Sequence, residues 1–125
     1  MTPHEFEVMC AGLLKHTYPE PEFIIELRKM VHTPARRFIP DITIRRSNDK
    51  VYVADCKYYQ SGKRKVDINT VDDLEAYRKL MGAERAFILA SQDADITERA
   101  ILYAKKFPVS IIRVRDSDTN INLGI

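Results

Sequence analysis

The chain has 125 residues, of which 45% are hydrophobic and 30% are charged. This composition predicts one globular domain, residues 1–125, with a core of its own. No apolar run approaches the roughly 20 residues that a membrane-spanning helix needs, so no membrane partner is expected. Two cysteines are too few for a disulfide scaffold, and the three histidines lack zinc-ligand spacing with either of them. Reduced thiols in a cytoplasmic protein are therefore expected.

The small net charge of +2 is unevenly distributed along the chain. Residues 28–65 hold eleven lysines and arginines against three aspartates, which leaves the remainder net acidic. A basic segment of this kind is typical of a surface that binds a polyanion such as a nucleic acid. The alternative is a solvated hairpin, because lysine and arginine are usually exposed.

The first predicted element is a helix over residues 3–16. Thr2 is its N-cap, Pro3 occupies the first helical position, and Glu5 completes a capping box. Residues 22–31 fit either a helix or a strand. We favour a strand because the segment contains paired β-branched isoleucines and a hairpin partner follows at once, after a loop over 32–37.

Two further strands are predicted over residues 38–46 and 50–59, joined by a polar turn. A basic loop then leads to a helix that is capped by Thr70 and stops at Gly82. The next strand, over residues 85–91, is apolar throughout, as in strands that are buried on both faces.

A final helix is predicted to begin with a capping box of Asp95 and Glu98 and to end at Pro108. A strand over residues 109–114 follows, and the tail beyond it is expected to be frayed or a weak edge strand. The predicted order places meander strands first and helix-connected strands second. This order indicates an α/β fold with one mixed sheet and helices on both of its faces.

The strand over residues 50–59 carries charges that its apolar surroundings do not explain. Side chains in a strand alternate between faces, so Asp55 and Lys57 share the face of Val53. Asp41, after Pro40, opens the preceding strand of the same hairpin. Two acids and a lysine that converge across a hairpin predict a site for a divalent metal and a phosphate. Hard oxygen ligands favour magnesium or manganese over zinc.

The first helix offers a further carboxylate, from either Glu5 or Glu7. We favour Glu7, because Glu5 is expected to serve the capping box. Each candidate also has a purely structural interpretation. Asp41 could cap a turn, Asp55 and Lys57 could form an ion pair at a sheet edge, and Glu7 could be a solvated helix residue.

The Pro40-Asp41 pair, followed by Asp55-Cys56-Lys57, resembles the PD-(D/E)xK signature of the restriction-endonuclease-like superfamily. The predicted order also resembles the αβββαβ core of that superfamily. The opening E-F-E-V-M-C-A-G-L-L is similar to the first helix of Mrr-like restriction endonucleases and archaeal Holliday-junction resolvases. Mrr-like proteins often have glutamine in place of Asp55, and resolvases usually have glutamate. Asp73, four residues before Tyr77, departs from the glutamine of RecB-type nucleases.

The resemblance implies metal-dependent cleavage of phosphodiester bonds in DNA. Asp41, Asp55 and the backbone carbonyl of Cys56 would hold Mg²⁺, for which Mn²⁺ would substitute. Glu7 would be a further or water-mediated ligand, and Lys57 would orient the attacking water and stabilise the transition state.

DNA is the implied partner, and the resolvase resemblance suggests a homodimer that cuts branched DNA. Five basic residues of the 28–65 segment would contact phosphates: Arg36, Arg37, Lys63, Arg64 and Lys65. One alternative keeps the fold without catalysis, as a DNA-binding or assembly subunit. Another is a binding module unrelated to nucleic acids.

Overall fold

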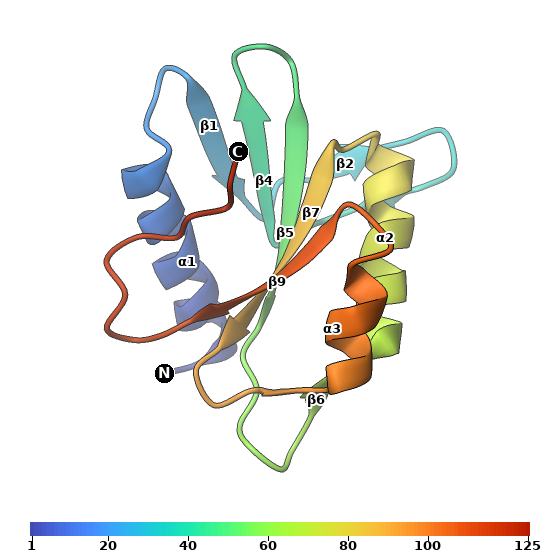
Figure 1. Ribbon diagram of the computed structural model, residues 1–125. Helices are drawn as coiled ribbons and strands as arrows, with labels where there is room; N and C mark the ends of the chain where they lie inside the picture. Colours follow the sequence, from blue (N-terminus) through green and yellow to red (C-terminus); the bar gives the residue numbers. More distant parts are fainter.

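A five-stranded sheet in the order β1-β4-β5-β7-β9 forms the centre of the molecule (Figure 1). The computed structural model describes residues 1–125. β4 is antiparallel to both of its neighbours, β1 and β5, whereas β5, β7 and β9 run parallel to one another. This confirms the predicted mixed sheet. The strands are Phe23–Leu27 (β1), Ile42–Arg46 (β4), Val51–Lys57 (β5), Arg85–Ser91 (β7) and Val109–Val114 (β9).

Helices cover both faces of the sheet, as the predicted order requires (Figure 1). α1 (Pro3–Thr17) packs on one face over a core of 16 buried residues. α2 (Ile68–Met81) and α3 (Glu98–Ala104) pack on the other face over a core of 12. α2 and α3 lie between successive parallel strands because such strands need crossover connections. None of the helices is long and apolar enough to cross a bilayer.

Two short strand pairs lie outside the main sheet. β2 (Val31–His32) and β3 (Arg37–Phe38) form a small hairpin that spans the expected loop over 32–37 and includes one end residue of each predicted strand beside it. The predicted strand over 38–46 is therefore divided, and Pro40 and Asp41 lie between β3 and β4. Proline lacks the N–H that a strand ladder needs, which explains the interruption. The other pair is parallel and joins β6 (Lys65–Val66) to β8 (Asp95–Ile96).

The helix starts follow capping chemistry, although not always at the predicted residue. Thr2 and Glu5 form the expected capping box of α1. Thr70 is not the N-cap of α2. Asp67 caps this helix, because its carboxylate accepts from the Thr70 N–H at 3.1 Å and its own N–H donates to the Thr70 hydroxyl at 3.2 Å. In the sequence, Asp67 three residues before Thr70 is the pattern that indicates this capping box.

The start and end of α3 also differ from the prediction. Thr97 is the N-cap and accepts a hydrogen bond from the Ala100 N–H at 3.1 Å. Asp95 belongs to β8 instead, and its carboxylate accepts from the Gly62 N–H at 2.8 Å. The helix ends at Ala104, before Pro108.

The C-terminal tail is neither frayed nor an edge strand. It passes along α1 (Figure 1), and Ile121 and Leu123 are each only 3% exposed in the core on that side of the sheet. The N–H of Ile121 donates to the Thr17 hydroxyl at 3.1 Å, and that of Leu123 to the Tyr18 hydroxyl at 2.8 Å. The tail therefore completes the α1 side of the core.

Truncating either buried tail residue should destabilise the whole chain. Ile121→Ala and Leu123→Ala should each lower the free energy of unfolding by about 2–5 kcal/mol, because each leaves a cavity in a packed core. Chemical denaturation measures this change. Asn120→Ala, at an exposed position, is the control and should change the value by less than about 0.5 kcal/mol. Equal effects of all three would contradict this role of the tail.

Candidate active site

The candidate site lies at the carboxyl end of β5, in the middle of the sheet. Val53 packs with α2 and α3, whereas Tyr52 and Ala54 pack with α1. Asp55 and Lys57 are two and four positions after Val53, so they share its face and point to the side of α2, as the strand periodicity predicted. The Lys57 ammonium lies 2.9 Å from Oδ2 of Asp55. This ion pair is real, but β5 is an internal strand, so it is not the edge pair of the structural alternative.

Asp41 is held against β5 by a long-range contact. The last residue pair between β4 and β5 is Ile42 with Ala54. Beyond it, the N–H of Cys56 donates to Oδ2 of Asp41 at 2.8 Å. Asp41 therefore does not simply cap a local turn. N–H and C=O of one strand residue point to the same side, so the Cys56 carbonyl also faces the Asp41 side of β5.

The two aspartates are close enough to perturb each other. The pKa of Asp41 is raised from 3.8 to about 7, first by burial, then by the adjacent Asp55 carboxyl, which can share a hydrogen bond with it and repels its charge. Burial opposes the charge of Lys57, but attraction to Asp55 outweighs it and the lysine pKa is raised. Lys57 therefore stays protonated at neutral pH and is a donor rather than a base.

Glu7 points inward and Glu5 does not, as the capping box predicted. Glu7 is 5% exposed. Its carboxylate accepts from Nε of Arg28 at 2.9 Å and from the terminal NH₂ of the same side chain. That NH₂ also lies 3.5 Å from Oδ1 of Asp41. Glu7 is thus not a solvated residue, and it reaches Asp41 through an arginine.

Arg28 is the residue of this site that the sequence did not reveal. It lies 21 positions from Glu7, and no motif or spacing marks it. No group of three or more acidic, histidine or cysteine side chains is arranged to hold a metal. The oxygens available to a cation are those of Asp41, Asp55 and the Cys56 carbonyl, with Glu7 occupied by Arg28.

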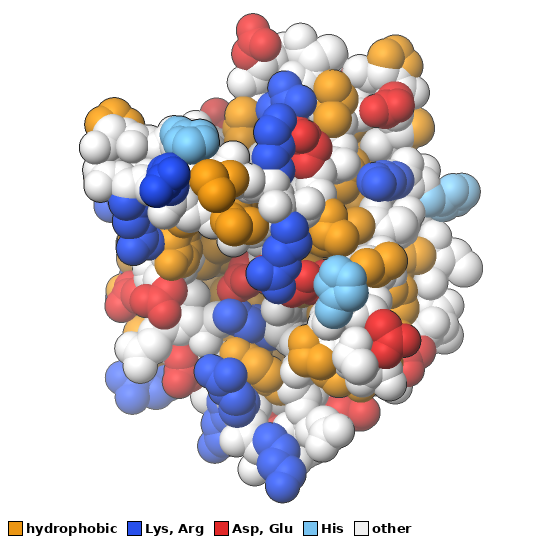
Figure 2. Space-filling view, turned by 180° about the vertical axis from the view of Figure 1, so that it is seen from behind, with side chains coloured by type: hydrophobic (Ala, Val, Ile, Leu, Met, Phe, Trp, Pro, Cys, Tyr) orange, Lys and Arg blue, Asp and Glu red, His pale blue; other side chains and the backbone are white.

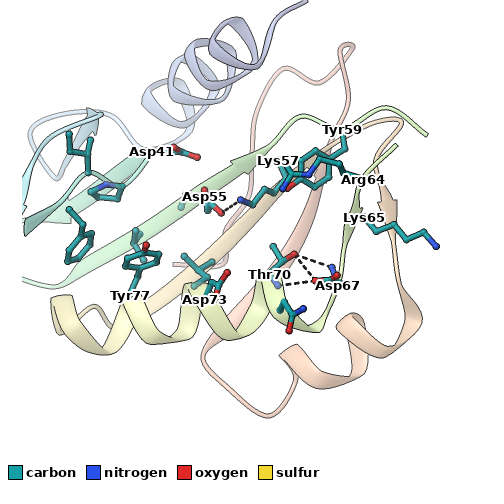
Figure 3. Close-up of a pocket in the computed structure, with 17 residues that line it drawn as sticks. Asp41, Asp55, Lys57, Tyr59, Arg64, Lys65, Asp67, Thr70, Asp73 and Tyr77 are labelled. Carbon is teal, nitrogen blue, oxygen red and sulfur yellow. Dashed lines mark hydrogen bonds and ion pairs between the residues drawn. The ribbon is translucent and has the colours of Figure 1, made fainter. Parts of the chain in front are cut away.

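A cavity of about 630 Å³ opens beside the aspartates, on the side of α2 (Figure 3). Asp55 and Lys57 form part of its sheet wall, and Asp73 and Tyr77 of α2 lie opposite. The cavity is larger than a single ion requires and falls within the range of small-ligand pockets. The cavity therefore has room beside the acids for a group larger than a single ion.

The five predicted DNA contacts are all exposed. Arg64 and Lys65 line it directly. The Arg64 guanidinium stacks on the Tyr59 ring at 5.0 Å, and that of Arg36 stacks on the Tyr77 ring at 4.9 Å. Arg36 thus stands beside the cavity on the β2–β3 turn, and Arg64 on the β5–β6 loop.

The five residues also differ from other basic residues of the same segment. Arg36, Arg37, Lys63, Arg64 and Lys65 form no ion pair, whereas glutamates neutralise Lys29, Arg45 and Arg46. Figure 2 shows lysine and arginine side chains along the back of the molecule, with acidic side chains between them. Part of the basic charge is therefore available to a ligand.

Comparison with known proteins identifies the family. The profile of an Mrr-type catalytic family, described as restriction endonuclease, matches residues 1–118. The chain belongs to this restriction endonuclease family. The family confirms the resemblance that the Asp41, Asp55 and Lys57 motif indicated. No curated protein matches the chain.

Solved structures of low sequence identity share the fold of this restriction endonuclease family member. One is AF1548, a protein of unknown function (TM-score 0.74, 16% identity, 90% of this chain and 58% of the other). Another is a repair endonuclease from Pyrococcus abyssi (TM-score 0.53, 18% identity, 81% of this chain and 43% of the other). A third is EndoMS, whose structure is a complex with double-stranded DNA (TM-score 0.59, 17% identity, 94% of this chain and 47% of the other). The chain thus corresponds to only part of each of these proteins.

The raised pKa of Asp41 should appear as a pH-dependent stability. Between about pH 4 and pH 7 the folded state retains a proton that the unfolded chain has lost. The Asp41 contribution to the free energy of unfolding should therefore fall as pH rises through this window, by up to about 1.4 kcal/mol per pH unit. Denaturant unfolding in EDTA measures it against Asp41→Asn, which cannot ionise.

The stability of Asp41→Asn relative to wild type should rise across this window and level off above about pH 7. Titrating groups that do not interact with Asp41 are common to both proteins and cancel in the difference. A difference that does not vary with pH would show that Asp41 ionises normally in the folded chain.

Proposed function

We propose that the chain is a Mg²⁺-dependent endonuclease that hydrolyses phosphodiester bonds in DNA. The observation that carries this proposal is the convergence of the Asp41 and Asp55 carboxyls beside the Lys57 ammonium, on the wall of a cavity flanked by unpaired arginines and lysines. Membership of the restriction endonuclease family supports the same reaction class.

The residues present fit a hard divalent cation. Burial and the adjacent Asp55 carboxyl raise the pKa of Asp41, and a bound cation would relieve the repulsion between the two acids. The Cys56 carbonyl adds a neutral oxygen, which Mg²⁺ and Mn²⁺ accept readily. Bound Mg²⁺ would lower the pKa of a coordinated water and neutralise charge on the phosphate.

Lys57 is positioned to act on the phosphate or the attacking water. Its ammonium remains charged because Asp55 compensates for its burial. From the face of β5 it can donate to a phosphate oxygen whose negative charge grows in the transition state. Asp55 fixes the lysine in this orientation through the 2.9 Å contact.

The flanking basic residues support DNA as the substrate. Arg36, Arg37, Lys63, Arg64 and Lys65 offer charges for phosphates, which are contacts that carry no sequence information by themselves. The cleavage should accordingly be dependent on DNA structure or only weakly specific for sequence. The EndoMS complex with double-stranded DNA, which shares this fold, supports DNA as partner.

One observation favours a catalytically inactive DNA-binding or assembly subunit as the alternative. Glu7, the third acid implied by the resemblance, is occupied by Arg28, which leaves two carboxylates for a cation. This alternative predicts salt-sensitive DNA binding without any cutting. The assay below separates the two functions.

Supercoiled plasmid should be cut in Mg²⁺ or Mn²⁺ and left intact in EDTA. Lys57→Ala should reduce the rate by roughly 10²–10³-fold, because it removes a donor that stabilises transition-state charge. Gel electrophoresis of the products measures both effects. Lys50→Ala, which removes an exposed lysine of the β4–β5 turn, is the control and should retain the wild-type rate.

The products also test the proposal and its alternative. Cutting that persists in EDTA, or that proceeds at the wild-type rate in Lys57→Ala, would refute the proposed mechanism, and binding without cutting would favour the inactive subunit. The homodimer suggested by the resolvase resemblance stays a prediction. Linear product formed in one encounter would support paired sites, and nicked circles alone would argue for a single site.

The unpaired basic residues should determine the salt dependence of DNA binding. In Lys63→Ala/Arg64→Ala/Lys65→Ala, the slope of log affinity against log salt should become shallower by up to about 3, since each phosphate contact contributes about 0.9. Fluorescence anisotropy with a short duplex in EDTA measures this slope.

A matched triple variant controls for net charge. Lys29→Ala/Arg45→Ala/Arg46→Ala removes the same charge from side chains that glutamates already neutralise. Its slope should remain close to that of wild type. Equal losses in the two triple variants would show that DNA responds to total charge rather than to the residues around the cavity.

A further inference from the structure

Arg28 is held at the site by its backbone as well as by its side chain. It directly follows β1 and has φ of 56°, in the left-handed region that residues other than glycine seldom adopt. Its N–H donates to the Asp41 carbonyl oxygen at 2.9 Å. This hydrogen bond holds the backbone of Arg28 next to Asp41, one of the candidate metal ligands.

The guanidinium lies between the buried Glu7 and the largely buried Asp41. It donates to both carboxylate oxygens of Glu7, one of them from Nε at 2.9 Å, and approaches Oδ1 of Asp41 at 3.5 Å. The side chains of Glu7 and Asp41 are 6% and 14% exposed, whereas that of Arg28 is 52% exposed. The other basic side chain within 4 Å of the Glu7 carboxylate is that of His4, with Nδ1 at 3.8 Å.

This arrangement places a positive charge where a cation would otherwise bridge the acids. A buried carboxylate is unfavourable without a cation or hydrogen-bond donors, and Arg28 supplies both to Glu7 in a two-point contact. Removing the guanidinium would leave two neighbouring acids whose hard oxygens suit a divalent ion. The same oxygens can therefore bind either the arginine or a metal.

We propose that Arg28 is a built-in counter-ion that keeps Glu7 out of the metal site. The wild-type chain then binds one divalent ion. A second ion, which depends on Glu7, binds only when the guanidinium is removed. The inference rests on the proposed function for the first ion, at Asp41 and Asp55. It departs from the expectation that Glu7 is a ligand. The second position concerns Glu7 and can be tested separately.

The test counts Mn²⁺ ions bound by the DNA-free protein, from the loss of the free-ion signal in electron paramagnetic resonance. Wild type should bind one ion and Arg28→Gly two, since glycine accepts the left-handed backbone. Arg28→Gly/Glu7→Gln should return to one. Lys29→Ala removes the same charge from the adjacent residue, which pairs with Glu26, and should still bind one.

A second readout is the melting temperature. Mn²⁺ should raise it more in Arg28→Gly than in wild type, because binding to the folded state alone stabilises that state. If Arg28→Gly does not fold without metal, refolding on Mn²⁺ addition supports the proposal and failure to refold contradicts it. Arg28→Asn, which also tolerates this backbone, should reproduce the result.

The outcomes separate this inference from the proposed function. One ion in wild type and one in both Arg28 variants would overturn the counter-ion role and leave the metal site at Asp41 and Asp55 intact. If wild type binds no ion and the Arg28 variants bind one that depends on Glu7, the metal site at Asp41 and Asp55 would be refuted. The counter-ion role of Arg28 would then stand. Two ions in wild type, reduced to one by Glu7→Gln, would show that metal displaces the arginine and would also overturn the inference.

Discussion

The hydrogen bond from the Cys56 N–H to the Asp41 carboxylate joins the two strands that carry the candidate site. β4 and β5 are paired through backbone contacts only as far as Ala54. Beyond that residue a side chain replaces the missing strand partner and satisfies a donor that would otherwise be unpaired. The same bond holds Asp41 beside Asp55, so the structural need of the strand end and the chemistry of the site are met by one contact.

The site is an accumulation of negative charge that the chain neutralises from two directions. Lys57, on the same strand as Asp55, provides a cation within the sheet. Arg28, at the end of β1, provides another on the side of α1. The cavity opens beside these groups, and the unpaired basic residues around it extend the positive potential outward. A polyanion would thus meet favourable charge before it reaches the acids.

Local geometry was predictable from the sequence and long-range contacts were not. Strand periodicity alone placed the acid and the amine of β5 on one face, and the capping box alone indicated that Glu7, not Glu5, points inward. Arg28 was missed because its contact with Glu7 spans 21 residues and needs a left-handed backbone. The tail was missed because its partners, Thr17 at the end of α1 and the following Tyr18, lie more than a hundred positions earlier in the chain.

The tight turn between β4 and β5 has a consequence for how such a site can evolve. Arg46 and Lys50 close this turn through a backbone hydrogen bond, and the ladder beyond it sets which residues of β5 face α2. A slip of one position would turn the acid and the amine into the apolar layer under α1 and bring Cys56 to the cavity. Single substitutions in β5 can therefore change the side chains of the site one at a time. A change in turn length would move both Asp55 and Lys57 away from the cavity in one step.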